Sequence, residues 1–403
     1  MGVDYQNVTT DDQLLSYCRE LSEADSIAMD TEFVAEHTYR PVLCLIQVAA
    51  EGKLSVIDPM GIEDLTPFWE TIAAEGHETI VHAGRGDVEF CLQAIGRHPS
   101  GLFDVQIAAA LVGMEYPAGY GTLIGRLLGD SSKKHETRTD WRRRPLSNRQ
   151  IEYALDDVRH LHPLRDTLQA RLNELGRLDW FEQEMTDWQD EIERAQKQER
   201  WRQISGNSGL DRRSLAILRE LWRWREAEAE RRNKPARRVL RDDLIVELAR
   251  RRTAEVKQIR AVRGLERGDL QRRLGEMARC IERGLELPEE ECPDTAFCKP
   301  KAKLSVLGQF LFSALGSICR EAHLAPNLVG GPADIRELIA YRTAGRLGRG
   351  ADRPKLARGW REVFVGRLFD DLLDGKTSIR VGDPSSDHPL VFDRGESGTL
   401  LEL

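Results

Sequence analysis

The sequence predicts an α/β domain with a mixed sheet, followed by one or two all-α helical domains. In the first 170 residues, strand-like runs alternate with helix-like runs, which is typical of helices packed against a mixed sheet. From about residue 145 onward, apolar residues recur at every third or fourth position, which predicts amphipathic helices. Breaks rich in glycine and proline divide the helical part into blocks. We therefore expect three domains, at residues 1–190, 207–290 and 300–403.

The expected strands of the α/β domain are short, mostly apolar runs bounded by turn-prone residues. They lie at residues 26–34 (SIAMDTEFV), 44–50 (CLIQVAA), 53–59 (KLSVIDP) and 78–84 (ETIVHAG). A helical pattern follows in DVEFCLQAIG, and GLFDVQIAAALVG begins as a strand and becomes a helix. The run after Leu146 has helical spacing, and Ser147 is expected to be its N-cap.

The C-terminal half is expected to contain two helical blocks of similar size. Residues 211–287 read as several amphipathic helices, and residues 303–375 are helical again around the turn-rich segment HLAPNLVGGPAD. The end of the chain, residues 376–403, is expected to form a short hairpin or an extended tail, and its role is unknown.

Composition places the chain among ordinary soluble proteins, with 40% hydrophobic and 31% charged residues and a net charge of −8. No apolar stretch approaches the roughly 18 residues that a membrane span requires, and the start lacks the pattern of a signal peptide. The seven cysteines are scattered and form no CxxC pair, which argues against disulfides and a structural zinc site. We therefore expect a cytoplasmic protein without a membrane partner.

Asp30 and Glu32 occur inside an apolar strand-like run, where unpaired charge is costly. Residues at positions i and i+2 of a strand project from the same face, so the two carboxylates repel each other unless a cation lies between them. A divalent cation with oxygen ligands fits this pair. The alternative is a strand end at which both acids face solvent.

Two later elements could complete such a site. Asp87 is expected to open the helix that follows the strand 78–84, where it could instead act as an N-cap. Tyr153 and Asp157 lie four residues apart on a helix and so share a face, although such a pair is also common on protein surfaces. Together the three elements supply four carboxylates and one phenol. Two cations about 3.5–4 Å apart in such a cluster bind both the attacking and leaving oxygens of a phosphodiester.

These segments resemble the ribonuclease D family, within the tyrosine-containing branch of the DEDD superfamily of 3′-to-5′ exonucleases. The resemblance rests on MDTEFVAEHTYRPVLCLIQVA, VHAGRGDVEF and KKHETRTDWRRRPLSNRQIEYALDDVRHL and runs from about residue 5 to 175. It implies an RNase H-like core that releases nucleoside 5′-monophosphates from an RNA 3′ end, using two divalent ions (Mg²⁺ or Mn²⁺). The implied metal ligands are Asp30, Glu32, Asp87 and Asp157. Asp30 would bridge both ions, and Tyr153 would hold the attacking water.

Further residues are candidates for substrate binding. Phe33 could stack under the terminal base or pack in the core, and His82 is expected to make a structural hydrogen bond rather than to bind metal. Residues 133–149 carry seven Lys or Arg against two acids, which favours contact with phosphates over a solvated charge run. The candidates in this basic run are Lys134, Arg138, Arg142 and Arg143.

The first helical block, residues 211–287, resembles the HRDC domain that ribonuclease D shares with RecQ-type helicases, with Trp224 and Arg225 at its recurring WR position. It implies auxiliary contact with nucleic acid or protein, and residues 303–375 could be a second, divergent copy. The expected partner is RNA with a 3′ end, such as a tRNA precursor or another structured RNA, with no obligate protein partner. The alternatives are a DNA exonuclease acting on single strands, a catalytically inactive nucleic-acid binder, and a protein scaffold.

Overall fold

The computed structural model describes residues 4–130, 139–295, 305–343 and 353–394. They form two compact units. The first unit contains the mixed sheet, the helices around it and the C-terminal helices, and the second contains the loop after the strand of Asp30 together with the central helical block. Lys134 and Arg138 of the basic run lie outside the described residues.

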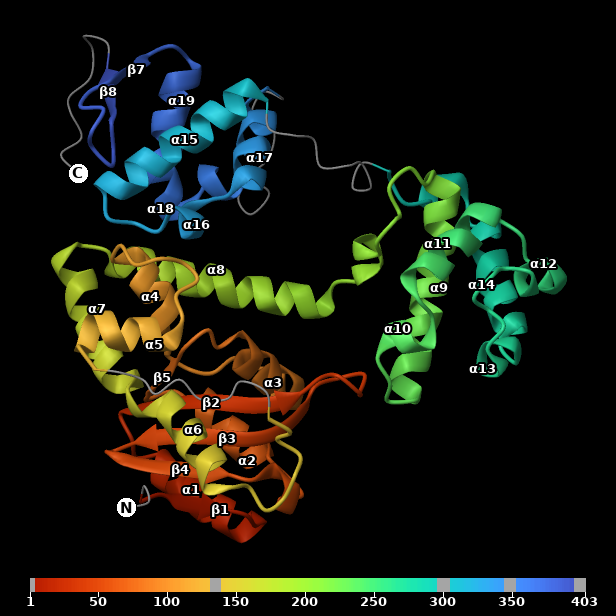
Figure 1. Cartoon of the computed structure of the whole chain (residues 1–403), viewed down its shortest axis with the longest axis horizontal. Coiled ribbons are helices and arrows are strands. Elements are labelled where there is room, and N and C mark those ends of the chain that lie inside the picture. The colour runs from red at the N-terminus through yellow and green to blue at the C-terminus, as the bar shows by residue number, and fades with distance from the viewer. Residues whose placement is uncertain (1–3, 131–138, 296–304, 344–352, 395–403) are drawn as a thin grey trace. The chain divides into compact units, whose positions relative to one another are not determined.

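The first unit is built on a six-stranded mixed sheet in the order β1-β4-β3-β2-β5-β6 (Figure 1). The pairs β1–β4, β2–β5 and β5–β6 are parallel, whereas β3 and β4 form an antiparallel pair. The predicted α/β class is therefore confirmed, and β2 has the bounds expected from the sequence. The strands are β1 Gln6–Val8, β2 Ser26–Val34, β3 Val42–Ala50, β4 Lys53–Ile57, β5 Glu78–Val81 and β6 Leu102–Asp104.

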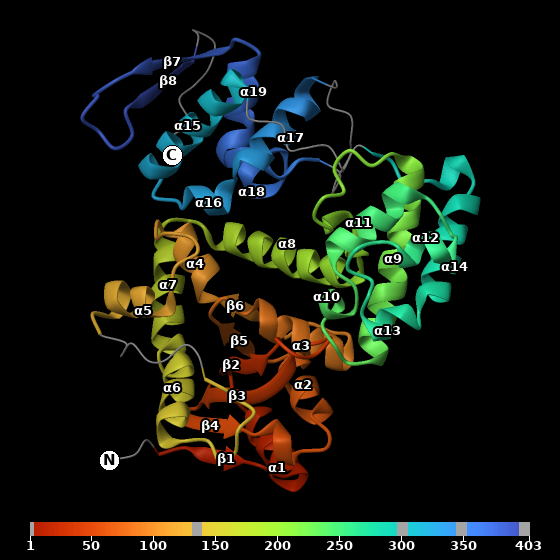
Figure 2. The same ribbon diagram turned by 45° about the vertical axis from the view of Figure 1, so that its right-hand side comes forward.

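Helices cover the sheet on both sides. Figure 2 shows the strands between α6 and α7 and the group formed by α1, α2 and α3. Contacts of α6 with β4 and of α7 with β5 fix the first group, while α1, α2 and α3 pack in succession. The helices are α1 Asp11–Leu21, α2 Thr66–Ala73, α3 Arg85–Ile95, α4 Val105–Leu111, α5 Tyr120–Leu123, α6 Asn148–Arg159, α7 Leu161–Glu174 and α8 Leu178–Lys197.

The sheet order brings two segments of the predicted site together. β2 is flanked by β3 and β5, and Ala28 pairs in register with Ile80. Because the two strands are parallel, the chain that follows Ile80 runs alongside Asp30 and leads into the turn before α3. The carboxylates of β2 therefore lie next to the segment that carries Asp87.

The start of α6 is fixed by local sequence, as predicted. Ser147 is the N-cap, and it forms a reciprocal capping box in which its side chain and that of Gln150 satisfy each other's backbone N–H groups. The helix ends at His160, so the long helical run of the sequence is divided into α6 and α7. This cap fixes the register of the helix that carries Tyr153 and Asp157.

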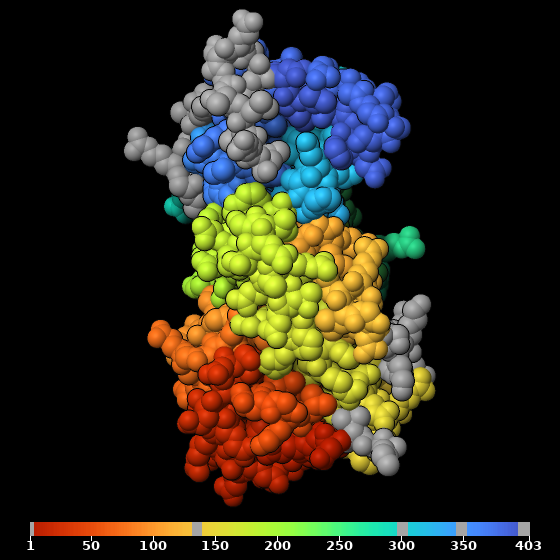
Figure 3. All heavy atoms as spheres, turned by 90° about the vertical axis from the view of Figure 1, so that its left-hand side faces the viewer, coloured from red at the N-terminus to blue at the C-terminus, as the bar shows by residue number. Residues whose placement is uncertain are grey.

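The C-terminal helices pack against α4 and α8 within the first unit. Figure 3 shows these blue elements in direct contact with the yellow-green and orange surface of the preceding helices. The Trp180 and Trp360 rings stack with centroids 5.1 Å apart, and Arg177 donates to the backbone carbonyl of His323 over 3.0 Å. The elements are α15 Val306–Glu321, α16 Pro326–Val329, α17 Pro332–Thr343, η7 Lys355–Ala357, α18 Gly359–Arg361, η8 Glu362–Gly366, α19 Arg367–Leu373, and the hairpin strands β7 Thr377–Val381 and β8 Leu390–Arg394.

A buried ion pair lies at the centre of this packing. Both terminal nitrogens of Arg361 donate to Glu184, over 2.5 and 2.8 Å, and Arg361 also donates to the backbone carbonyls of Leu328 and Val329. Burial alone would raise the pKa of Glu184, but the Arg361 hydrogen bonds and charge outweigh burial and hold it below its ordinary value. The pair is therefore ionised and fully satisfied.

The second unit is the central helical block, with a core of aliphatic residues on α9, α11 and α14. Both residues of its WR dipeptide are structural, because Trp224 donates to Glu276 over 2.8 Å and the buried Arg225 donates to Asp242 over 2.6 Å. The helices are α9 Arg212–Arg231, α10 Ala236–Val239, α11 Asp242–Arg251, α12 Val256–Arg260, α13 Gly268–Gln271 and α14 Leu274–Glu286.

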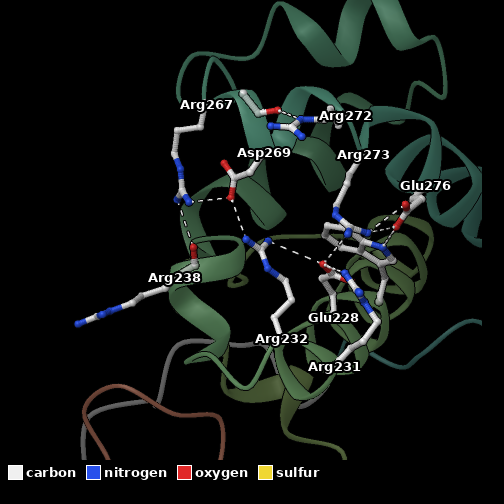
Figure 4. A network of polar contacts seen from close by, with 11 residues as sticks. Glu228, Arg231, Arg232, Arg238, Arg267, Asp269, Arg272, Arg273 and Glu276 are labelled. Atoms are coloured by element: carbon white, nitrogen blue, oxygen red, sulfur yellow. Dashed lines mark hydrogen bonds and ion pairs between the residues drawn. The ribbon is translucent and has the colours of Figure 1, made fainter.

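Arginines outnumber acids in a polar network on this unit (Figure 4). The buried Glu228 accepts from Arg231 over 2.8 Å and pairs with Arg273 at 2.9 Å. Arg232 lies between Glu228 and Asp269, at 3.7 and 3.5 Å respectively. A single buried carboxylate thus orders several guanidinium groups that have surface on the outside of the unit.

No helix among the described residues is long and apolar enough to cross a membrane. The cysteines in the described part of the chain are all buried free thiols, and Cys298 lies outside it.

Removal of one partner from the buried ion pair should destabilise the C-terminal packing. We expect Arg361→Leu to cost about 3–5 kcal/mol in unfolding free energy, because Glu184 would stay buried without its partner. Urea unfolding, with hydrogen exchange of α15 and α18 peptides, measures the effect. The control is Arg380→Leu, whose partner Asp393 is exposed, so its cost should stay below about 1 kcal/mol. An equal loss of unfolding free energy in both variants would contradict the special role of the buried pair.

Candidate active site

Three carboxylates from two elements converge on one face of the sheet. Oxygen atoms of Asp30, Glu32 and Asp157 all lie within 4.8 Å of one another. Asp30 and Glu32 share a face of β2, as strand geometry requires, and Asp157 approaches from α6. The three side chains are partly exposed, so the cluster is open to an entering ligand.

Asp87 is the most buried acid of the site, with 4% of its surface exposed. It lies in the first turn of α3, whose N-cap is Gly84 and has no side-chain cap hydrogen bond. The expectation that Asp87 opens the helix is therefore wrong by two positions, since α3 begins at Arg85. Gly84 rather than Asp87 is the N-cap residue, and the charge of Asp87 raises the pKa of Asp30.

The turn before α3 is held by Asp104, a residue that the sequence analysis did not single out. The fully buried Asp104 carboxylate accepts from the backbone N–H groups of Ala83 and Gly84, over 3.2 and 3.0 Å. Ala83 has a φ of 53°, and a Cβ on Gly84 would lie 2.5 Å from a methyl group of Val81. This tight turn aims the first turn of α3 at β2. The feature of the sequence that could have indicated this role is the position of Asp104 at the end of a strand and directly before a helix.

Tyr153 and Asp157 lie one turn apart on α6 and share a hydrogen bond between their side chains. The neighbouring Asp156 forms an ion pair with Arg159 at 2.7 Å. Asp156 thus takes a different direction from Asp157. The face of α6 that carries Tyr153 and Asp157 is the one directed at β2, because Asp157 belongs to the carboxylate cluster.

The carboxyl groups of the cluster all hold protons more tightly than isolated acids do. Burial, followed by the charges of neighbouring acids, raises the pKa of Asp30 and lifts that of Glu32 to about 8. Burial is also the main cause of the raised pKa of Asp157, about 7, and of Asp87, about 6. Burial, together with the repulsion between neighbouring acids, keeps some of these carboxyl groups protonated near neutral pH.

This donor set fits a divalent cation. Only oxygen ligands are offered, which is the preference of Mg²⁺ and similar hard cations. One carboxylate oxygen of Asp87 is buried without a hydrogen-bond partner, although buried polar atoms are nearly always satisfied. A cation would satisfy that oxygen and remove the repulsion among the acids.

The remaining sequence candidates fall into different environments. His82 donates from Nε2 to the backbone carbonyl of Ala118 over 2.9 Å and packs on Tyr120 with ring centroids 5.4 Å apart. This is the structural hydrogen bond that we expected. Phe33 is 41% exposed as a residue, and its stacking on a base stays a prediction.

The three consecutive arginines of the basic run differ in their contacts. Arg142 forms a forked pair with Asp140, with nitrogen–oxygen distances of 2.9 and 3.2 Å. The Arg143 side chain is 84% exposed. Arg144, which the sequence analysis did not propose, turns inward to Asp58. Because the three arginines are adjacent and identical, the sequence does not indicate that Arg144 is the structural one.

Family models define the class of protein to which this fold and site belong. Residues 5–173 match the model of the 3′-5′ exonuclease family, and residues 214–281 match that of the HRDC domain. The sheet and the acidic cluster therefore belong to a 3′-5′ exonuclease domain, of a superfamily that depends on metal ions. The predicted HRDC-type helical domain is confirmed as well.

Two curated relatives and a crystal structure narrow the class to one family. Ribonuclease D from Zymomonas mobilis is 35% identical over 93% of this chain and 95% of its own length, and that from Gluconacetobacter diazotrophicus is 33% identical over 93% and 94%. The crystal structure of Escherichia coli RNase D has a TM-score of 0.80 and 28% identity, and the match covers 93% of this chain and 99% of that one. The chain belongs to the ribonuclease D family.

A more distant structure shares the fold. The catalytic core of RRP6 from Trypanosoma brucei matches with a TM-score of 0.52 at 18% identity, over 70% of this chain and 80% of that one.

The raised pKa values predict how the stability of the metal-free protein depends on pH. Unfolded carboxylates titrate near pH 4, whereas Asp157 and Glu32 titrate near 7 and 8 in the folded state. The folded state therefore retains protons that the unfolded state has lost, and its stability falls as pH rises from about 4 to 8. Thermal unfolding in a chelator between pH 5 and 8.5 measures this decrease.

In Asp157→Asn the stability should fall less steeply with rising pH, because the substitution removes one of the repelling charges. The exposed Asp166, which pairs with Arg165 outside the cluster, provides the control Asp166→Asn, whose pH profile should follow that of the wild type. If the stability of the wild type in a chelator rose over this pH range, the raised pKa values of the cluster would be contradicted.

Proposed function

We propose that this chain is a metal-dependent 3′-5′ exoribonuclease that shortens RNA from its 3′ end and releases nucleoside 5′-monophosphates. The observation that carries the proposal is the convergence of Asp30, Glu32 and Asp157 within 4.8 Å, beside the buried Asp87. Family membership supports the same activity.

Two divalent cations, Mg²⁺ or Mn²⁺, are the proposed cofactors, with Asp30, Glu32, Asp87 and Asp157 as their ligands. The charges of the other three acids all raise the pKa of Asp30, which fits a set of ligands that would hold cations together. When bound, such ions lower the pKa of a water molecule and neutralise charge on the scissile phosphodiester. The protein residues then have to position the reactants rather than to supply a strong base.

Tyr153 is the proposed positioning group for the attacking water. Burial, followed by the charges of Asp157 and Glu32, raises the pKa of the Tyr153 phenol above its ordinary value. The phenol therefore keeps its proton throughout the physiological range and can hydrogen-bond a water molecule beside Asp157. Its contribution is orientation of the nucleophile.

The proposed substrates are RNAs with structured 3′ ends, such as tRNA precursors. Support comes from the Escherichia coli homologue, which is described as an exoribonuclease involved in structured RNA processing. Phe33 would stack on the terminal base, while Arg142 and Arg143 would neutralise phosphates near the entrance. Single-stranded DNA is the alternative substrate.

The rest of the chain is assigned supporting roles. We retain residues 1–190 as the exonuclease domain, 207–290 as the HRDC-type domain and 300–403 as a second, divergent copy. The guanidinium groups ordered by Glu228 (Figure 4) would add a phosphate-contacting surface to the HRDC-type domain. Buried free thiols are consistent with action in the reducing cytoplasm.

Shortening of a labelled RNA tests the activity. With Mg²⁺ or Mn²⁺, 5′-labelled RNA should lose nucleotides stepwise from its 3′ end, and matched DNA should be degraded more slowly. A chelator or Asp157→Asn should lower the rate by on the order of 10³-fold, because uncompensated charge then develops at the phosphate. Asp156→Asn, on the neighbouring position of α6, is the control and should retain most of the activity. RNA binding without shortening would contradict the proposal.

The salt dependence of the rate tests the basic run. Arg143→Gln should weaken RNA binding and reduce the slope of log(kcat/KM) against log[salt] by about 0.7, the value expected for one lost phosphate contact on a single strand. Arg380→Gln, on the C-terminal hairpin, should leave the slope unchanged. Equal slopes of log(kcat/KM) against log[salt] for the wild type and Arg143→Gln would show that Arg143 makes no phosphate contact.

A further inference from the structure

Arg144 makes a dense set of hydrogen bonds inside the exonuclease domain. Its guanidinium donates to both carboxylate oxygens of Asp58, over 2.5 and 2.6 Å, in a forked geometry that only arginine provides. It also donates to the backbone carbonyls of Cys44 on β3 and Trp141, each over 2.7 Å. With about a quarter of its side chain exposed, Arg144 is a structural link rather than a free phosphate contact.

The link joins two parts of the fold that the sequence keeps far apart. Asp58 directly follows β4, and Cys44 lies on the neighbouring strand β3, so both partners belong to the rigid sheet. Trp141 belongs to the loop that precedes α6. Arg144 therefore fastens this loop to the sheet just before the Ser147 cap begins the helix.

The fastened loop places an aromatic ring against the proposed catalytic phenol. Trp141 is 7% exposed, and its ring lies 6.1 Å from that of Tyr153, with an angle of 35° between the two planes. Tyr153 in turn shares a hydrogen bond with Asp157. The phenol thus has the Trp141 ring on one side and the carboxylate as its hydrogen-bond partner.

We propose that Arg144 and Trp141 are positioning residues that fix the orientation of the Tyr153 phenol in the reaction. Arg144 acts through Trp141, and Trp141 acts through its ring contact with Tyr153. The inference rests on the proposed function, because it assigns these residues to the step in which Tyr153 orients the water. We call the contacts of Arg144 with Asp58 and Trp141 the clamp. Loss of the clamp would leave RNA binding intact and would lower the rate of hydrolysis, since displacement of an orienting group by about 1 Å can cost on the order of 10²-fold.

A double-mutant cycle on the full-length protein tests the proposal, with steady-state shortening of 5′-labelled RNA as the readout. Trp141→Leu should lower kcat by on the order of 10- to 100-fold with little change in KM. Trp141→Phe should recover most of kcat, because it restores an aromatic ring. In the Tyr153→Phe background, Trp141→Leu should cause no further loss, since its effect passes through the missing hydroxyl.

Arg144→Lys provides a second, milder variant, because it keeps the charge and removes the fork. It should lower kcat in the same direction and should also have no added effect in the Tyr153→Phe background. Arg165→Lys is the matched control. Arg165 pairs with Glu78 over 2.5 Å at a similar exposure of its side chain, but the pair is not part of the clamp, so kcat should remain near that of the wild type. Thermal unfolding of each variant confirms that it is folded.

Three outcomes would overturn the inference. Costs that multiply in the double variants would show that Trp141 and Arg144 act independently of the phenol. A rise in KM at unchanged kcat would assign them to RNA binding. An unaltered kcat in Tyr153→Phe would show that the Tyr153 hydroxyl group, through which Arg144 and Trp141 are proposed to act, does not contribute to the reaction. The activity itself is tested separately by the chelator and Asp157→Asn, so failure of the clamp is distinguishable from failure of the exonuclease assignment.

Discussion

The repulsion among four converging carboxylates is the constraint on which the rest of this exonuclease domain depends. Asp30, Glu32 and Asp157 meet within 4.8 Å, with the buried Asp87 close enough to raise the pKa of Asp30. Without compensation this arrangement destabilises the fold, because buried like charges disfavour ionisation. The surrounding structure must therefore hold the acids together against their own repulsion.

Each acid is held by an element that is fixed independently of the cluster. Asp30 and Glu32 lie on β2, an interior strand of the sheet, and cannot separate because they share one strand. The turn before α3 is fastened by Asp104 through the backbone of Ala83 and Gly84. The capping box at Ser147 fixes the start of α6. The strand pairing of β2 and the Ser147 cap carry no charge, whereas the charge of the Asp104 carboxylate acts on the site itself, because it raises the pKa of Asp87.

The sequence was most informative where a local pattern carries the structure. The bounds of β2 and the Ser147 cap could be predicted because an apolar run bounded by turn-prone residues and a capping residue are local signals. The three-residue strand β1 is too short for a pattern and forms only by parallel pairing with β4. The bonds that Asp104 makes to Gly84 and Arg144 makes to Asp58 could not be predicted, because these partners lie 20 and 86 residues away in the sequence. Charge alone placed Arg144 among residues expected to be solvated or to contact phosphate.

The packing of the C-terminal helices on α8 illustrates the same limit, and it also indicates what a buried ion pair contributes. Glu184 and Arg361 are separated by 177 positions, so no periodicity could have joined them. Such a pair adds little net stability over an apolar contact of equal size, because both ions must be desolvated. Its geometric demands are strict, however, since Arg361 also donates to two backbone carbonyls and Glu184 accepts from the Trp360 indole over 3.1 Å. An apolar interface can slide by part of a helical turn at modest cost, whereas this one leaves a buried charge unpaired in any other register. The pair therefore specifies one orientation of the C-terminal helices on α8, in the same way that the forked pair of Arg144 and Asp58 specifies one position of the loop before α6.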